Sequence, residues 1–426
     1  MEIFEELSAR TLSRVSRRLL PFLFTLYVFA YLDRVNIGYA ALFIRRELHF
    51  SDTVYGTGAG LFFLSYALFE VPSNLVLLRL GPRRWIGILM VVWGMISASM
   101  PLVHTPAEFY LLRFLLGAAE AGFFPGIILY LTFWFPQKQR ARAIALFMAA
   151  TATAGVIGAP LSNLLLRLNG VAGIAGWKWL FVGEGVPSIL LGLLVFRMMT
   201  DTPKQADWLN KDEQAWLMET LAIERSSISE AHSVHLRDVW RNAVLWLLAF
   251  IYFAISVGLY SLSLWLPVVL KQLSHASDLR VILLTAVPYL LAAITMVLIA
   301  RSSDQKQERK WHLVAPLIGA AVGFGLSVVL QNPYMAMASL FLAAAGIWGC
   351  FGPFWALPTT MLRGTAAAGG IAIINSVGAL GGFCGPYLMG RVSDASHSFN
   401  AALAVAAGLL LIAAAVASRL RVTNKY

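Results

Sequence analysis

Charged residues are scarce in this sequence. Asp, Glu, Lys and Arg together make up 13% of the 426 residues, whereas hydrophobic residues make up 59%. A soluble domain carries roughly 25% charged residues, because its surface must face water. About half that share predicts that most of the surface faces lipid. The composition therefore argues against the two or three soluble domains that the length alone would suggest, and it predicts an integral membrane protein.

Cysteine is also rare, and the titratable side chains form no catalytic pattern. Cys350 and Cys384 are the only two cysteines, and both lie in apolar runs without the spacing of a metal site. We interpret them as small packing residues in helices. No nucleophile with a nearby base and no set of metal ligands stands at a recognisable spacing. We therefore expect no metal, no cofactor and no enzymatic activity.

The formal net charge of +11 follows the pattern of a membrane protein. In a soluble protein it would suggest a nucleic-acid partner. Here Lys and Arg gather in short gaps between apolar stretches, for example around Arg17, Arg83 and Arg309, and these gaps fall on one side if the chain crosses twelve times. The pair Arg45–Arg46 is the exception. We expect no nucleic acid, both termini in the cytoplasm, and an amphipathic N-terminal lead-in, not a cleaved signal.

Long apolar runs are what the sequence has in abundance. A helix needs about 20 mostly apolar residues to cross a bilayer. Runs of this kind predict an all-α membrane protein with twelve transmembrane helices, six before a polar gap and six after it. They lie near 18–42, 55–79, 85–103, 107–133, 142–166, 177–199, 243–270, 280–301, 312–330, 334–361, 366–390 and 399–418.

The polar gap and a faint repeat predict two related halves. The stretch 201–241 is the longest polar segment and is interpreted as a cytoplasmic amphipathic linker between six-helix bundles at 1–200 and 242–426. FWFPQKQRARA in the fourth run has its counterpart in FWALPTTMLRGTA of the tenth, and GVIGAP in the fifth has its counterpart in GGFCGP of the eleventh. Parallel six-helix repeats are a known transporter architecture, so we expect two pseudo-symmetric bundles.

Four ionisable residues lie at membrane depth in the first half, and they are the candidate site. Charge there costs roughly 2.5–3.5 kcal/mol per residue on insertion scales and usually faces a cavity. Asp33 and Arg34 lie in the first run, and Arg113 and Glu120 in the fourth. Arg113 and Glu120 share one helix face but stand roughly 10 Å apart, so each needs a partner from another helix. The alternative is an ion-pair network that only joins two helices.

Other polar groups in the runs carry weaker signals. Glu70, Arg79 and Arg167 stand near helix ends and are interpreted as snorkelling or gating groups, and Glu184 is left outside the site. An amide at membrane depth must find a partner, which favours a role for Asn375. Some aromatic residues could complete a pocket, although for each one alone the sequence favours packing in the core or against lipid. They are Tyr31, Tyr66, Tyr260, Trp265 and Trp355.

These motifs resemble the anion:cation symporter family of the major facilitator superfamily, which includes bacterial galactonate, tartrate, phthalate and hydroxyphenylacetate permeases. The resemblance rests on YLDRVNIGYA, FFLSYALFEVPSN, RFLLGAAEAGFFPG, GPFWALPTTMLRGTAAAGG and INSVGALGGFCGPYLMG, and it covers nearly the whole chain outside the linker. It implies a monomer in a bacterial inner membrane. It also implies a site with Arg34 and Arg113 for substrate and Asp33 and Glu120 for protons. Further substrate contacts implied by matching positions are Tyr31, Tyr66, Asn375 and Trp355.

The sequence departs from the family pattern at two places. Leu78 stands where the turn after the second run usually carries an acid, whereas Asp304 keeps the acid in the second half, where we expect it to form a gate with Arg309. Thr151 stands near the position of a glutamine in the galactonate site, which argues against identical sugar-acid recognition.

The expected function is proton-coupled uptake of a small organic anion, such as a sugar acid, a dicarboxylate or an aromatic carboxylate. The two arginines would attract the carboxylate, and the two acids would be neutralised by protons before the site moves. The alternative is a proton antiporter that exports drugs or metabolites. Such exporters usually carry a glycine-dense motif in the fifth helix, and only GVIGAP appears there in this sequence, which weakens the alternative. A membrane sensor would carry a signalling domain, which the sequence lacks.

Overall fold

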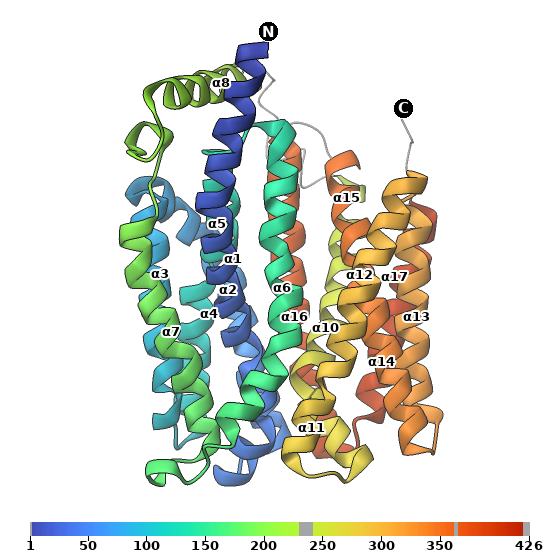
Figure 1. Cartoon of the computed structure of the whole chain (residues 1–426). Coiled ribbons are helices and arrows are strands. Elements are labelled where there is room, and N and C mark those ends of the chain that lie inside the picture. Colours follow the sequence, from blue (N-terminus) through green and yellow to red (C-terminus); the bar gives the residue numbers. More distant parts are fainter. Residues whose placement is uncertain (1, 230–241, 362–364, 421–426) are drawn as a thin grey trace.

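The computed structural model describes residues 2–229, 242–361 and 365–420, and it is a bundle of long helices (Figure 1). No strand occurs in these residues. Within them, twelve helices or helix pairs are long and apolar enough to cross a membrane. The prediction of an all-α protein with twelve transmembrane helices is therefore confirmed.

The first six spans and the segment after them run in chain order without long loops. Spans 3 and 4 each combine two elements, since η1 (Met100–Leu102) extends α3 and a two-residue turn separates α4 from α5. The elements are α1 (Glu2–Glu47), α2 (Asp52–Leu80), α3 (Pro82–Ser99), α4 (Pro106–Glu120), α5 (Phe123–Thr132), α6 (Gln137–Leu166), η2 (Val171–Gly173), α7 (Gly176–Met198), η3 (Pro203–Gln205) and α8 (Lys211–Ser229).

The last six spans follow the same plan. Span 8 is divided at Thr285 and span 10 at Cys350, so spans 4 and 10, at corresponding places in the two halves, are both interrupted. The elements are α10 (Ala243–Ser274), α11 (Asp278–Leu284), α12 (Ala286–Lys306), α13 (Lys310–Val329), α14 (Pro333–Gly349), α15 (Phe351–Met361), α16 (Thr365–Ser396) and α17 (Asn400–Arg419). Residues 230–241 of the predicted linker lie outside the described residues.

The first helix is longer than a membrane requires. At 1.5 Å per residue, the 46 residues of α1 extend about 69 Å, more than twice the roughly 30 Å of a hydrocarbon core. The predicted lead-in is thus the first part of one continuous helix. It is attached to α8, because Arg10 and Arg14 form ion pairs with the buried Glu213 at 3.3 and 2.7 Å.

Small residues bring neighbouring helices close together, as is usual in membranes. A Cβ on Gly117 of α4 would lie 2.0 Å from the backbone oxygen of Phe62 on α2. A Cβ on Gly323 of α13 would lie 2.5 Å from the backbone nitrogen of Ala343 on α14. Any larger side chain at either position would push its helices apart.

The first and last six spans meet along a seam where α2 packs against α16, α1 against α10, and α6 against α11 and α12. The start of α1, the end of α17 and α8 lie at one end of the bundle, here called the terminal end, and α11 lies at the opposite or far end (Figure 1). Helices α1 and α2, which carry Asp33, Arg34 and Tyr66 of the candidate site, both lie along this seam.

Polar contacts across the seam concentrate at the far end. Asp394 of α16 accepts hydrogen bonds from the backbone N–H groups of Asp52 and Thr53 at 3.0 and 2.7 Å. Three further contacts join the halves there: Arg46 with Asp278 at 3.0 Å, Tyr55 Oη with the Leu264 carbonyl at 2.9 Å, and Asn163 with the Leu279 carbonyl at 2.7 Å.

Candidate functional site

Arg34 and Glu120 form an ion pair between α1 and α4. Arg34 Nη2 lies 3.3 Å from Glu120 Oε2, and the two side chains are 12% and 1% exposed. Glu120 is the last residue of α4, directly before the turn at Ala121 and Gly122 that starts the second part of span 4. Its other oxygen, Oε1, has no hydrogen-bond partner among the described residues. The partner that Glu120 needed from another helix is thus Arg34, in a pair that leaves half of the carboxylate unused.

Arg113 lies fully buried on α4 and has no carboxylate partner in the described part of the chain. Its Nη2 donates to the Ala59 carbonyl at a long 3.4 Å, and Nε and Nη1 donate to nothing there. Buried cations are normally paired, because leaving one unpaired costs several kcal/mol. The arrangement therefore supplies a positive charge with free donors at membrane depth.

Asp33 forms an ion pair with neither arginine and is held by hydroxyl groups instead. Ser97 of α3 donates to its Oδ1 at 2.8 Å, and Ser188 of α7 donates to its Oδ2 at 2.7 Å. Successive residues of a helix project about 100° apart, so Arg34 reaches α4 while its neighbour Asp33 points toward α3 and α7. Of the two acids and two bases expected at the site, Arg34 and Glu120 thus form an ion pair, and Asp33 is held by serines. Arg113 is left without an acidic partner among the described residues.

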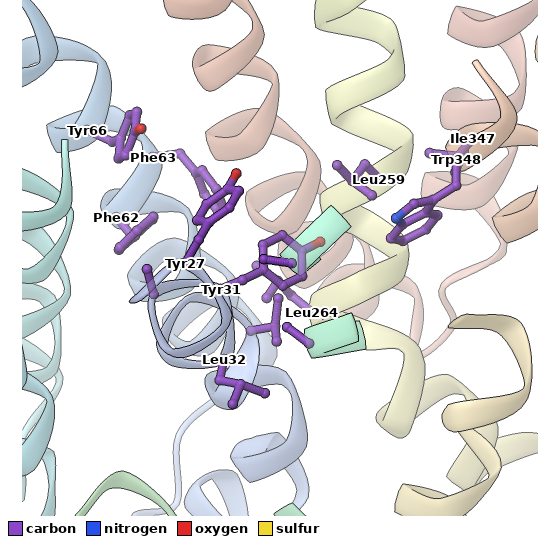
Figure 2. Close-up of a cluster of buried hydrophobic side chains, with 14 of the residues drawn as sticks. Tyr27, Tyr31, Leu32, Phe62, Phe63, Tyr66, Leu259, Leu264, Ile347 and Trp348 are labelled. Atoms are coloured by element: carbon purple, nitrogen blue, oxygen red, sulfur yellow. The ribbon is translucent and has the colours of Figure 1, made fainter. Parts of the chain in front are cut away.

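Aromatic rings line the arginines. The Arg34 Cζ lies 5.0 Å from the ring centroid of Tyr66, and the Phe62 ring lies 5.6 Å from Arg34 Cζ and 4.9 Å from Arg113 Cζ. Figure 2 shows Tyr66 and Phe62 on α2 and Tyr31 on the neighbouring α1. Tyr260 of α10 packs against Phe63 across the seam, with ring centroids 4.0 Å apart. Phe62 was not singled out from the sequence, because a phenylalanine in an apolar run carries no signal of its own.

Asn375 and Trp355 lie in the second half in different surroundings. Asn375 Nδ2 donates to Glu70 Oε1 across the seam at 2.7 Å. Glu70 is buried, so it is no snorkelling group. Trp355 belongs to an aromatic cluster, with its ring 4.9 Å from Tyr252 and 5.3 Å from Phe354. Asn375 thus bonds to Glu70, an acid that we had interpreted from the sequence as a snorkelling or gating group.

The expected gating residues pair with each other at the turn between α12 and α13. Asp304 forms an ion pair with Arg309, whose Nη1 also donates to Ser303 Oγ at 3.0 Å. Partial burial raises the pKa of the neighbouring Glu308, but hydrogen bonds from the Trp311 backbone and from His312 outweigh burial and hold this pKa below its usual range. Glu308 therefore stays ionised at the start of α13.

The corresponding turn between α2 and α3 recruits its acid from elsewhere in the chain. Leu78 is exposed there, as its apolar character allows in a membrane. Asp201, which follows α7, accepts a hydrogen bond from the Arg83 backbone N–H at 2.8 Å and lies against Gly81. The acid that the sequence lacks at this turn is thus supplied by the end of span 6.

Comparison with known proteins identifies the family. Residues 23–386 match the family model described as Major Facilitator Superfamily. The chain is 46% identical to the "Putative tartrate transporter" of Agrobacterium vitis over 97% of this chain and 91% of that protein. It is 38% identical to the "Quinolone resistance transporter" of Acinetobacter baumannii, covering 91% and 90%.

A solved structure has the same fold. The inward-facing, occupied structure of a bacterial homologue of the human lysosomal transporter Spinster superposes with a TM-score of 0.79 at 18% identity, covering 96% of this chain and 98% of that chain. At this identity the likeness concerns the fold alone. Together with the twelve spans, the family match and the relatives show what kind of protein this is: the chain belongs to the major facilitator superfamily and is a multi-pass membrane transporter of small organic molecules, not an enzyme.

Proposed function

We propose that the protein takes up a small organic anion together with protons. The observation that carries the proposal is Arg113, a fully buried guanidinium that, among the described residues, has two unused donor nitrogens and no carboxylate partner. A guanidinium stays charged and can bind a carboxylate through two parallel hydrogen bonds. A substrate carboxylate would supply both the missing charge and the missing acceptors.

Proton binding and anion binding are linked through Glu120. When Glu120 is ionised it pairs with Arg34. A proton on Glu120 would end that pairing and leave Arg34 free for the substrate, against the same Phe62 ring that Arg113 contacts. Each ligand would thus favour the other, which is what symport requires. Asp33 would hold a second proton on the opposite side of α1.

The remaining predicted residues complete the proposal. Tyr66 lies beside Arg34, Tyr31 lies one turn before Arg34 on α1, and both would contact the substrate from the first half (Figure 2). Asn375 and Trp355 would do so from the second half once the Glu70 contact is released. Asp304 and Arg309 would act at the gate.

Transport would follow from rocking of bundles 1–200 and 242–426 about this site. The charge pattern of the loops favours cytoplasmic termini in a bacterial inner membrane, which makes the far end the outer end. The contacts at that end, such as Asp394 with α2, support an inward-facing state. We propose that a monomer suffices, because all the residues named come from one chain.

Export of drugs by proton antiport is the second candidate. It is favoured by the 38% identity to a relative named for quinolone resistance. An exporter would bind substrate in competition with protons, whereas the linkage through Glu120 predicts that protons promote binding.

The test uses purified protein in proteoliposomes with an imposed pH gradient. L-tartrate, a sugar acid and an aromatic acid are each paired with the neutral amide of the same acid. We expect at least one carboxylate to accumulate inside when the outside is acidic, and its amide to fail. Accumulation of neutral compounds or of quinolones alone, with no carboxylate transported in any gradient, would contradict the proposal.

A further inference from the structure

Glu184 is a buried acid at membrane depth that the proposed site does not use. It lies on α7, its residue is 1% exposed, and neither of its carboxyl oxygens has a hydrogen-bond partner among the described residues. Asn36 of α1 and Ser162 of α6 face this carboxyl without bonding to it. An ionised carboxylate left in this way would bear the full cost of losing its hydration.

Two groups connect Asp33 with Glu184: the Asn36 amide, which lies 3.5 Å from Asp33 Oδ1 and faces the Glu184 carboxyl, and Ser188, which bridges Asp33 and the backbone of Glu184. The Ser188 hydroxyl lies 2.7 Å from Asp33 Oδ2 and 3.1 Å from the backbone carbonyl oxygen of Glu184. A hydroxyl has one proton to donate and cannot serve both acceptors fully. A proton on Asp33 Oδ2 resolves the conflict, because the carboxylic acid then donates to Ser188 and Ser188 donates to the carbonyl.

The surroundings of the two acids contain little that could neutralise them. Neither Asp33 nor Glu184 forms an ion pair in the described part of the chain. Two adjacent carboxylates in a low-dielectric site cannot both stay ionised, so such pairs retain a proton. The titratable or charged groups that face the pair are Tyr39 from α1 and Arg113 and Glu120 from α4. The other polar groups there are Asn36 from α1, Trp93 and Ser97 from α3, Ser162 from α6 and Ser188 from α7.

We propose that Asp33 and Glu184 share one transported proton, which Glu184 receives from the far end and passes to Asp33. This inference rests on the proposed proton coupling and adds a residue to it. Glu184 stands eight residues, or about 12 Å, from the far-end start of α7, whereas Asp33 stands 14 residues, or about 21 Å, from the far-end terminus of α1. Glu184 is therefore the acid nearer to the outer solution.

The test follows the carboxylic C=O bands of the full-length protein in liposomes by infrared spectroscopy as pH is varied, with no substrate present. The band lost in Asp33→Asn identifies Asp33. In Glu184→Gln, Asp33 loses its negative neighbour and should release its proton at a pH lower by at least about half a unit. Asp33→Asn should shift the Glu184 band in the same direction, since the coupling is reciprocal. The matched control, Glu219→Gln on the exposed face of α8, should shift neither band.

The outcomes separate this inference from the proposed function. Unchanged titration midpoints of the carboxylic C=O bands in both Glu184→Gln and Asp33→Asn would overturn the shared proton. If one of these variants fails to fold, the other still tests the inference. If midpoints stay unchanged while Asp33→Asn still loses gradient-driven L-tartrate accumulation, proton coupling stands without Glu184. If the wild-type protein accumulates no carboxylate although the bands are coupled, the proposed function fails and the carboxyl pair remains.

Discussion

The first and last six spans have the same helical plan but opposite chemistry. Asp33, Glu70, Arg113, Glu120 and Glu184 are all buried inside the first six. In the described residues of the last six, no Asp, Glu, Lys or Arg is buried, and the interior consists of apolar side chains with a few serines and a threonine. Because buried charge is costly in a membrane, its concentration in one half indicates function, while the other half supplies packing surface.

Removing the unpaired cation should have the largest effect. Arg113→Ala deletes two charge-assisted hydrogen bonds to the substrate carboxylate, worth together about 3 kcal/mol, so binding should weaken by about 100-fold or more. Arg113→Lys should restore little of it, because an ammonium cannot form the bidentate contact. Calorimetric titration with the transported carboxylate measures this. The matched change in the second half, Arg391→Ala at an exposed position of α16, should change affinity less than about twofold. An equal loss of affinity in Arg113→Ala and Arg391→Ala would contradict the difference between the two halves.

Glu120→Gln should separate exchange from accumulation. The neutral amide removes the charge that holds Arg34, so substrate can still bind and exchange across the membrane. It cannot take up a proton, and therefore accumulation driven by a pH gradient should fall to background. Counterflow and gradient-driven uptake in proteoliposomes measure the two properties separately. Full accumulation by this variant would show that the carboxyl is structural and that protons travel by another route.

A smaller effect is expected from the second half, whose charges lie at helix ends. Asp394→Asn weakens the charged acceptor for the N–H groups at the start of α2, by about 1 kcal/mol. The far end should then open about fivefold more often. Spin labels at Val171→Cys and Tyr334→Cys, in a chain with Cys350→Ala and Cys384→Ser, report this distance. Asp212→Asn on α8 is the control, and an unchanged distance distribution in Asp394→Asn would show that this contact does not hold the far end closed.

Sequence reasoning identified what depends on local composition. The twelve spans follow from runs of apolar residues, and Arg113 and Glu120 stand out because charge in such runs is rare. The pairing of those charges could not be predicted, because it depends on how each helix is rotated about its axis. Ser97 and Ser188 give no signal in a helix until that rotation places them on Asp33.

Contacts between distant segments were missed for the same reason. Glu70 stands near the end of an apolar run and was interpreted as a snorkelling or gating group, yet its partner Asn375 lies 305 residues away. Asp201 was assigned to the linker, although it completes the turn that Leu78 leaves without an acid. Both residues depend on the packing of whole helices, which a single sequence does not specify.

The length of α1 has a mechanical consequence for the whole cycle. Arg10 lies 24 residues, or about 36 Å, from Arg34 along one continuous helix, so a tilt of about 10° about Arg34 displaces Arg10 by about 6 Å. An ion pair of 2.7 Å between Arg14 and Glu213 cannot stretch that far. While these ion pairs hold, α8 moves together with α1, so a displacement of α8 in the aqueous phase is coupled to Asp33 and Arg34 in the middle of the membrane.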